Sequence, residues 1–390
     1  MEEEFIPYSK QNISQEDIDA VSLVLKSKFI TQGPYVDIFE KAISKKVKAK
    51  FAIALNSATS ALHLACLALD LKEGDYLWTT PISFVASANC ARYCSATVSF
   101  VDINSSTGLI SINELEEKLK IAAKKNKLPK IIIPVHLGGS SCEMKKIYEL
   151  SRKYNFKIIE DASHALGGLY EQEPVGSCKY SDVTVFSFHP VKMITTGEGG
   201  MVTTNDINIA NKIKTLRSHG ITKLEKDFIY EKPGDWYYEQ QSLGFNYRIT
   251  DLCCALGTSQ LSKLENFIFQ RTNIDNKYRE LLQDTCFNMI EIKSNVKSSF
   301  HLSILKLPAV DKNLHKFIFE GLKKKNIGVQ LHYLPIHLQP YYREMNFKKG
   351  DYPESEAYAI SSLSIPNYPG LETKHVLRVI NVLKNLLNKY

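Results

Sequence analysis

The sequence of 390 residues predicts an α/β fold, with a large, mostly parallel sheet domain followed by a smaller C-terminal α+β domain. Up to about residue 262, short apolar segments alternate with longer amphipathic ones, which is typical of strands joined by crossover helices. The apolar segments are rich in β-branched and aromatic residues and lack strict alternation, as expected when helices cover both faces of a sheet. Beyond residue 262 a long helical pattern leads into weaker strands.

Each element follows from its local pattern. In chain order, the strands predicted for the large sheet are 51–55, 76–79, 97–102, 130–134, 157–160, 183–188 and 201–204. Helices are predicted between them at 60–69, 112–120 and 144–154. The helical stretch 264–282 then leads to strands at 301–307 and 329–332 and to a last helix at 373–387. The sequence therefore predicts a large domain at residues 1–262 and a small domain at residues 263–390.

The composition favours a globular protein that acts on small molecules. The formal net charge is +7, but the lysines lie in short runs spread over helical patterns, which is typical of solvated helix faces rather than of a nucleic-acid groove. No apolar stretch approaches the roughly 20 residues that span a bilayer, and the acidic first residues lack the apolar core of a secretion signal. The eight cysteines form no C-x-x-C pair, which favours free thiols. We therefore expect a cytoplasmic protein that has neither a membrane nor a nucleic acid as partner.

The run from residue 186 to residue 200 is the most informative segment of the chain. Lys192 lies just past the predicted strand 183–188, with Ser187 five residues before it and a glycine-rich turn after it. The residues on both sides of Lys192 are apolar, and a solvated lysine gains little in such a setting. Desolvation supplies the free amine that a lysine needs to form a Schiff base with an aldehyde cofactor. Lys192 is therefore a candidate for that role.

A second chemical group stands upstream. Asp161 ends the predicted strand 157–160, at the edge where the active sites of parallel sheets gather. A carboxylate at that edge can hold the proton of a pyridine nitrogen. A strand-end aspartate is also typical of a turn or a helix cap, and the lysine motif favours the catalytic interpretation. His164, three residues later, is placed to bond the ring hydroxyl of a cofactor, although a lone histidine more often has a structural role.

The turn at 56–60, Asn-Ser-Ala-Thr-Ser, follows one predicted strand and opens the first predicted helix. Its small residues, Ala58 and Thr59 among them, leave backbone N–H groups free at a helix N-terminus, where the dipole favours an anion. Ser187 would add a hydroxyl group to the same site, and Phe84 is placed to stack on a ring. An ordinary helix cap for the turn and a core position for Phe84 are the alternatives.

A lysine, a carboxylate and an anion-binding helix start are together what pyridoxal phosphate requires of a protein. The sequence has no G-x-G-x-x-G after a first strand and no G-x-x-x-x-G-K-[ST], so dinucleotide and P-loop functions lack support. Its histidines have no metal-ligand spacing such as H-E-x-x-H. We therefore predict a pyridoxal-phosphate enzyme without a metal site.

These residues closely resemble the pyridoxal-phosphate nucleotide-sugar aminotransferases of the DegT type, which have the aspartate aminotransferase fold (fold type I). The segments that carry the resemblance run nearly end to end: 56–62, 79–89, 161–167, 186–200, 216–221, 236–256 and 329–342. Within the family, the chain is most similar to members that serve pseudaminic acid biosynthesis. The lysine segment is highly specific, and the occurrence of all these segments together is more specific still.

The resemblance implies a role for each matching residue. Lys192 and Asp161 would be catalytic, the first holding the cofactor and moving a proton, the second pairing with the pyridinium. The implied cofactor-binding residues also include Ala58, Thr59, Phe84, His164, Ser187 and Asn246, the last of which reaches the phosphate of the neighbouring subunit. The implied substrate-binding residues are Tyr8, Lys28, Phe29, Ile30, Thr31, Arg248, His332, Tyr333, Leu334 and Pro335. The resemblance therefore implies a homodimer with shared active sites, and an N-terminal segment that contributes to the substrate cleft.

The implied reaction moves the amino group of L-glutamate to the 4-keto carbon of a UDP-linked 4-keto-6-deoxy-N-acetylhexosamine. An aminotransferase that acts on another UDP- or dTDP-linked keto sugar, or at C3, is the nearest alternative. A dehydratase branch of the family has histidine in place of the lysine, and Lys192 disfavours that activity. A catalytically silent, cofactor-binding regulator is a different class of function, and the presence of both Lys192 and Asp161 disfavours it.

Overall fold

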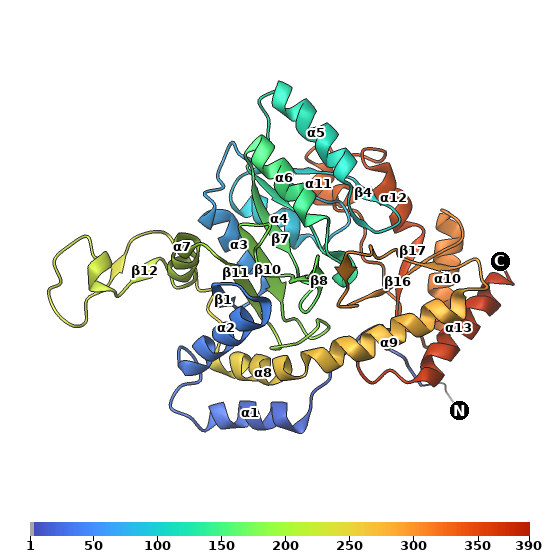
Figure 1. Ribbon diagram of the computed structural model, residues 1–390, viewed down its shortest axis with the longest axis horizontal. Coiled ribbons are helices and arrows are strands. Elements are labelled where there is room, and N and C mark those ends of the chain that lie inside the picture. The colour runs from blue at the N-terminus through green and yellow to red at the C-terminus, as the bar shows by residue number, and fades with distance from the viewer. Residues whose placement is uncertain (1–3) are drawn as a thin grey trace.

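The computed structural model describes residues 4–390, and a twisted sheet of seven strands forms the centre of that part of the chain (Figure 1). The order across the sheet is β1-β11-β10-β7-β6-β2-β3. Its strands are β1 (Phe51–Leu55), β2 (Tyr76–Thr79), β3 (Thr97–Phe100), β6 (Ile131–Ile133), β7 (Lys157–Asp161), β10 (Val183–Ser187) and β11 (Gly200–Thr204). β11 pairs antiparallel with β1 and β10, and the other strand pairs are parallel. The mostly parallel sheet is therefore confirmed.

Helices cover both faces of the sheet. One face packs against α3 (Ala58–Ala68), α4 (Ala86–Tyr93) and α7 (Ile207–Arg217). The other face packs against α2 (Pro34–Val47), α5 (Ile112–Lys124), α6 (Met144–Tyr154) and α8 (Asp251–Ser262). Within β6, Ile131 and Ile133 join the first cluster and Ile132 joins the second. Because helices cover both faces of the sheet, apolar side chains lie on both sides of the strands, and the strands appear in the sequence as continuous apolar segments.

Three parallel strands end at one edge of the sheet and bring distant segments together. β1, β7 and β10 point the same way, so the residues that follow them lie side by side at their carboxyl ends. β1 leads there into α3, β7 ends in Asp161, and β10 leads into the loop that carries Lys192. The edge predicted to hold the site therefore gathers all three segments.

The loop between β10 and β11 is closed at its base. The N–H of Phe188 donates to the carbonyl of Gly199 at 2.9 Å, and the N–H of Thr196 donates to the carbonyl of Phe188 at 3.0 Å. The Thr195 hydroxyl donates to the same carbonyl at 3.0 Å. Both ends of the loop that carries Lys192 are therefore fixed on adjacent strands.

The C-terminal part of the chain has its own sheet and its own apolar cluster. β14 (Asn288–Met289), β16 (Ser303–Lys306) and β17 (Ser362–Ile365) form an antiparallel sheet beside α10 (Lys312–Lys324) and α13 (Thr373–Leu387). The long helix α9 (Leu264–Leu282) contributes its first turns to the cluster around α2 and α8, and its later turns to the C-terminal cluster. Ile6 also packs into the C-terminal cluster. The domain boundary at residues 262 and 263 stays a prediction.

Two differences from the predicted elements concern this C-terminal part. The strand predicted at 329–332 does not form, because the segment makes a single bridge from Gln330 to Ser364 and then turns toward the large domain. β17 was not predicted. The remaining helices are α1 (Gln15–Leu25), α11 (Pro340–Arg343) and α12 (Pro353–Ala359). The remaining strands are β4 (Ile103–Asn104), β5 (Leu109–Ile110), β8 (Leu169–Tyr170), β9 (Glu173–Pro174), β12 (Ile221–Thr222), β13 (Glu239–Gln240) and β15 (Val296–Lys297).

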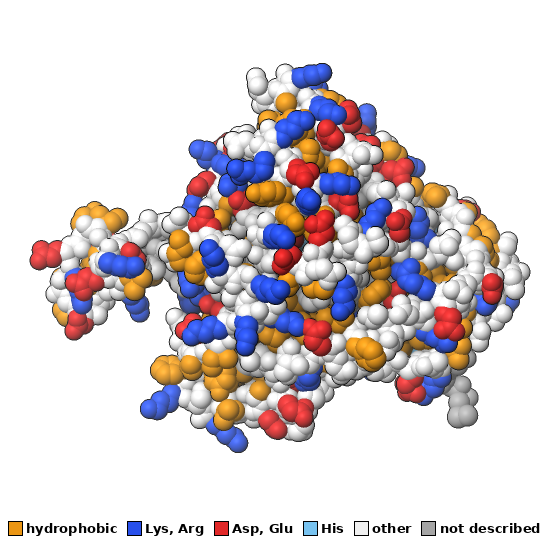
Figure 2. All heavy atoms as spheres, viewed as in Figure 1, with side chains coloured by type: hydrophobic (Ala, Val, Ile, Leu, Met, Phe, Trp, Pro, Cys, Tyr) orange, Lys and Arg blue, Asp and Glu red, His pale blue; other side chains and the backbone are white. Residues whose placement is uncertain are grey.

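An arm around β12 and β13 projects from the body of the protein at the left of Figure 1. It exposes large apolar side chains, with 70% of Ile229, 73% of Tyr230 and 78% of Trp236 accessible to solvent. Figure 2 shows apolar side chains on the projecting surface. Among residues 4–390, no helix has both the length and the apolar character needed to cross a bilayer.

Candidate active site

A cavity of about 390 Å³ lies at the edge where β1, β7 and β10 end. Of the residues predicted for the site, those that line it are Tyr8, Ala58, Thr59, Phe84, Asp161, His164, Ser187, Lys192, His332 and Tyr333. They come from both ends of the chain and from the middle, so the fold brings together residues that the sequence separates widely.

Lys192 lies in the closed loop after β10. Its backbone N–H donates to the carbonyl of His189 at 2.9 Å, and its side chain lines the cavity. Desolvation lowers the pKa of Lys192 to about 8, an effect that the charge of Asp161 opposes in part. A larger fraction of Lys192 is therefore a free amine near neutral pH than of an exposed lysine, which favours a nucleophilic role.

Three donors fix the carboxylate of Asp161 at the end of β7. The hydroxyl of Ser87 donates to Oδ2 at 2.6 Å. The hydroxyl and the backbone N–H of Ser163 donate to Oδ1 at 2.6 and 3.1 Å. Ser87 lies on α4, and its hydroxyl also bonds that of Ser83, in the segment before the helix, at 2.6 Å. The side chain is therefore held in one orientation at the cavity wall.

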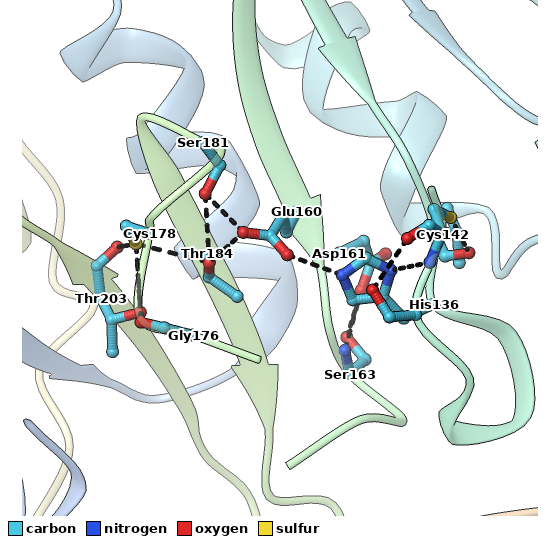
Figure 3. A network of polar contacts seen from close by, with 12 residues as sticks. His136, Cys142, Glu160, Asp161, Ser163, Gly176, Cys178, Ser181, Thr184 and Thr203 are labelled. Atoms are coloured by element: carbon cyan, nitrogen blue, oxygen red, sulfur yellow. Dashed lines mark hydrogen bonds and ion pairs between the residues drawn. The ribbon is translucent and has the colours of Figure 1, made fainter. Parts of the chain in front are cut away.

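The neighbouring residue on β7 faces a different polar network (Figure 3). Glu160 is buried and bonds His136 Nε2 at 2.8 Å, the Ser181 hydroxyl at 2.5 Å and the Thr184 hydroxyl at 2.9 Å. Although burial favours the neutral acid, these hydrogen bonds lower the pKa of Glu160. The backbone N–H of Cys142 donates to His136 Nδ1 at 3.1 Å, so the imidazole proton lies on Nε2 and points at Glu160. The network ties β7 to its two neighbours, β6 and β10.

The start of α3 leaves backbone donors free at the cavity. Ala58 and Thr59 occupy the first turn, so their N–H groups have no acceptor within the helix. The hydroxyl of Ser57 accepts the N–H of Ser60 at 3.1 Å and caps the helix. A Cβ at Gly200 would lie 2.4 Å from the carbonyl of Ser57, so only glycine at the start of β11 lets this turn sit so close to the lysine loop.

The opposite wall is built from three histidines and a tyrosine. The N–H of Gly138 donates to His164 Nδ1 at 3.2 Å, and His164 Nε2 lies 3.1 Å from the hydroxyl of Tyr333. His301 packs on His164 with ring centroids 4.4 Å apart. His332 Nδ1 bonds the Ser364 hydroxyl at 2.8 Å. The arrangement engages both ring nitrogens of His164 within the protein.

Burial keeps these groups uncharged. Desolvation lowers the pKa of His164 and of His301 well below the usual value, and Lys192 adds to the effect on both. For the same reasons the pKa of His332 falls to about 3. Burial raises the pKa of Tyr333, which therefore keeps its proton. Neutral His164 accepts at Nδ1 and donates from Nε2 to Tyr333, so the hydroxyl proton of Tyr333 is left for another acceptor.

Six of the predicted residues lie away from the cavity of their own chain: Lys28, Phe29, Ile30, Thr31, Asn246 and Arg248. They gather on one side of the molecule. Thr31 bridges to Thr250, and the N–H of Asp251 donates to the carbonyl of Ile30 at 3.1 Å. The side chain of Asn246 is exposed, while its carbonyl accepts from Asn56 at 3.5 Å. These residues do not complete the site of the chain that carries them.

Leu334 and Pro335 line a neighbouring groove instead. This groove has a volume of about 1190 Å³ and is bounded by α10, α12 and the segment 330–335. It shares Ser83, Phe84, His332 and Tyr333 with the cavity, so the two spaces adjoin. The exposed fraction of the Phe84 side chain is 58%, which excludes the alternative of a core residue.

Sequence reasoning missed several residues that shape the site: Ser83, Ser87, Ser163 and His301. Ser163 had a local signal, because an aspartate two residues before a serine is typical of a side-chain turn. Ser87 is 74 residues from Asp161 and had none. His301 fell within a predicted strand, 301–307, and received no separate interpretation.

The residues present fit pyridoxal phosphate. A fixed carboxylate, a lysine with a lowered pKa and free N–H groups at a helix start line one cavity. The described residues contain no group of three or more His, Cys, Asp or Glu side chains that could hold a metal ion. The arrangement favours chemistry at a bound ring that carries both an aldehyde and a phosphate.

Comparisons with known proteins agree with this geometry. The DegT/DnrJ/EryC1/StrS aminotransferase family matches residues 11–384. A Campylobacter jejuni relative, named UDP-4-amino-4,6-dideoxy-N-acetyl-beta-L-altrosamine transaminase, is 41% identical over 386 residues and 98% of each chain. The structure of Helicobacter pylori PseC, an aminotransferase involved in the biosynthesis of pseudoaminic acid, has a TM-score of 0.89 at 32% identity, covering 99% of this chain and 100% of that one. A Streptococcus pneumoniae protein assigned as a sugar aminotransferase, solved in its PLP form, has a TM-score of 0.89 at 26% identity over 99% of each chain.

These matches span nearly the whole chain and confirm the predicted resemblance, the aspartate aminotransferase-like fold and the cofactor. The chain belongs to the DegT/DnrJ/EryC1/StrS aminotransferase family and is an aminotransferase that depends on pyridoxal phosphate.

Proposed function

We propose that this aminotransferase moves the amino group of L-glutamate to C4 of a UDP-linked 4-keto-6-deoxy-N-acetylhexosamine. The product would be UDP-4-amino-4,6-dideoxy-N-acetyl-β-L-altrosamine, in pseudaminic acid biosynthesis. The observation that carries the proposal is the meeting of Lys192, Asp161 and the start of α3 in one cavity. The relatives from Campylobacter jejuni and Helicobacter pylori support this substrate class.

The size of the cavity supports a substrate with a long tail. A volume of about 390 Å³ suits the cofactor with a single sugar ring, and a nucleotide needs further space. The adjoining groove of about 1190 Å³ offers that space. Its lining combines Lys312 and Lys316 with apolar side chains such as Leu334 and Pro335, which suits phosphates and a base.

Different residues of the chain would carry out different parts of the amino transfer. Bound pyridoxal phosphate supplies an electron sink for the carbon that exchanges its amino group. The Lys192 amine takes a proton from one carbon and returns it to another. The Asp161 carboxylate, fixed by Ser87 and Ser163, would hold the proton of the pyridine nitrogen. Tyr333, oriented by His164, would donate its hydroxyl proton to an oxygen of a bound molecule.

The predicted homodimer with shared active sites remains part of the proposal. The exposed side of the molecule that carries Asn246 and Arg248 is continuous with the projecting arm and its exposed apolar side chains. Such exposure is typical of surfaces that pack against another chain. Arg248 would hold a carboxylate of glutamate in the partner's site, because a guanidinium group bonds a carboxylate through two parallel N–H donors.

Mixing two inactive variants should restore activity if the sites are shared. Chains with Lys192→Ala are mixed with chains carrying both Asn246→Ala and Arg248→Ala, under conditions that exchange subunits. One of the two sites in each mixed dimer then contains only unaltered residues, because its lysine and its Asn246–Arg248 pair come from different chains. The measurement is turnover before and after exchange.

The matched control is a mixture of Lys192→Ala and Asp161→Asn chains. Both changes damage the half of the site that a single chain provides, so no site in this mixture is intact and activity should stay absent. Mixed dimers that form in the first mixture without any return of turnover would contradict the shared site.

The capture of pyridoxal phosphate by the cofactor-free protein should depend on pH. The pKa of Lys192 is lowered to about 8, so its amine is protonated and unreactive below that pH and free above it. The rate of capture, followed by absorbance, should rise up to about pH 8 and then level off. An ordinary lysine derivative, with a pKa near 10.4, should continue to gain rate up to about pH 10. A protein profile with the same midpoint as the free lysine would contradict the desolvation of Lys192.

A substrate panel tests the proposed reaction itself. The purified holoenzyme is incubated with L-glutamate and a series of UDP- and dTDP-linked 4-keto and 3-keto sugars, and the amino sugar formed is identified by NMR. We expect the fastest turnover with the UDP-linked 4-keto-6-deoxy-N-acetylhexosamine. Faster turnover of another keto sugar would favour the alternative substrate, and no turnover with any of them would favour a cofactor-binding regulator.

The eight cysteines, all free in the structure, support a reducing compartment such as the cytoplasm as the site of action.

A further inference from the structure

A second hollow, of about 440 Å³, lies at the β3 edge of the large sheet, between β3, α5 and the segment 345–347. It shares no lining residue with the active-site cavity. Four cationic side chains line it: Arg92, Lys118, Lys125 and Lys127. Within residues 4–390 its lining contains no aspartate and no glutamate. Figure 2 shows Lys and Arg side chains over the region of α5. The lining of the hollow is therefore positively charged without a counter-charge of its own.

Lys118 extends from α5 toward the sheet. Its Nζ donates to the Ser99 hydroxyl at 2.7 Å and to the carbonyl of Phe100, and it lies 4.7 Å from the centroid of the Trp78 ring. Burial lowers the pKa of Lys118 to about 8, and no carboxylate within residues 4–390 opposes that effect. The ammonium group is therefore enclosed among neutral partners, where a bound anion gains more than it would at an open surface.

Arg92 adds a second fixed positive charge to the lining. Its Nη1 donates to the carbonyl of Ala96 at 2.7 Å, which fixes the guanidinium at the end of α4. The fixed guanidinium group lines the hollow, where its charge attracts an anion.

We propose that this hollow binds a phosphate-bearing anion, either free diphosphate or the diphosphate of a nucleotide. Lysine and arginine donate charge-assisted hydrogen bonds to phosphate oxygens, and the absence of acidic side chains from the lining removes the competing acceptor. The volume lies within the range of roughly 300–1,000 Å³ that is usual for small-molecule sites. The proposal goes beyond the aminotransferase reaction and does not depend on it.

The two tryptophans of the chain allow a direct binding test. Trp236 is exposed on the projecting arm, so Trp236→Phe leaves Trp78 as the single tryptophan, beside Lys118. The emission of Trp78 in this variant holoenzyme is followed while inorganic diphosphate, UDP or uridine is added. Movement of the Lys118 charge near the indole should change the emission with diphosphate and with UDP in a saturable way, and uridine should have no effect. A response to UDP without one to diphosphate would identify the nucleotide as the ligand.

A second set of variants assigns the response to the hollow. Lys118→Met keeps the apolar stem over Trp78 and should weaken binding by roughly tenfold or more. The double variant Lys125→Gln, Lys127→Gln at the rim should weaken binding of the phosphate ligands several-fold. It provides the same test if Lys118→Met fails to fold. Lys120→Met is the matched control, because Lys120 lies on the same helix outside the hollow. Equal responses to uridine and UDP, no response to any phosphate, or unchanged affinity in the Lys118 and rim variants would overturn the proposal.

Discussion

Replacing Lys192 with alanine should abolish amino transfer while leaving the protein folded and partly able to bind its cofactor. The amine is needed twice, first to capture the cofactor and then to carry a proton between carbon atoms. The phosphate site at the start of α3 and the Asp161 carboxylate are unaltered in this variant, so they should still retain pyridoxal phosphate without a covalent bond. We expect turnover to fall on the order of 10⁴-fold or more.

Two measurements separate the role of Lys192 from a loss of structure. Borohydride reduction of the unaltered holoenzyme, followed by peptide mapping, should place the cofactor on Lys192, and the alanine variant should yield no labelled peptide. Lys179→Ala is the control, because Lys179 is exposed and its contacts are with Glu173 and the ring of Tyr180, away from the cavity. Label on a different lysine, or turnover that survives the loss of Lys192, would contradict the assignment.

Asp161→Asn should lower turnover by several orders of magnitude with little change in fold. An amide has no charge with which to hold a proton on the pyridine nitrogen, and the ring is then a poor electron sink. The amide also offers one acceptor oxygen in place of two, so it cannot accept from Ser87 and Ser163 together. The rate of the half-reaction with L-glutamate, followed by the change in cofactor absorbance, should report the loss.

Asp102→Asn is the matched control for this change. Asp102 is also buried, but it accepts hydrogen bonds from Ser355 and Glu354, away from the cavity. The control variant should lose thermal stability and keep the cofactor absorbance of the unaltered enzyme. Near-normal turnover in Asp161→Asn would leave that residue with a structural role alone.

The sheet could be predicted closely because its strands are buried on both faces. The apolar run that ends at Asp161 matches β7 to within one residue, and the run before Lys192 matches β10 to within one residue. β17 has serines at alternate positions, and a segment of which half is serine does not stand out as apolar. The segment 329–332 is apolar enough to predict a strand, but the contact of Tyr333 with His164 draws the chain toward the cavity instead.

The site could be predicted where the chemistry is local and not where it depends on packing. Lys192 and the turn before α3 carry their signals within a few neighbouring residues. The role of Ser87 depends on the packing of α4 beside the end of β7, which no sequence pattern near either residue encodes. Both nitrogens of His164 have protein partners, and only the tertiary structure reveals them. The placement of Asn246 and Arg248 in a partner's site stays a prediction.

The closed base of the loop between β10 and β11 has a consequence for motion during turnover. The backbone that carries Lys192 is tied at Phe188 to both Thr196 and Gly199, so hinge bending of this loop would break hydrogen bonds beside the sheet. The Lys192 amine must nevertheless move in each cycle, because it first captures the cofactor and then carries a proton between carbon atoms. The amine can move by rotation about the bonds of the four-carbon lysine side chain. Such rotation takes picoseconds to nanoseconds when it is unhindered. Repositioning of the Lys192 amine should therefore need side-chain rotation alone and no opening of the protein.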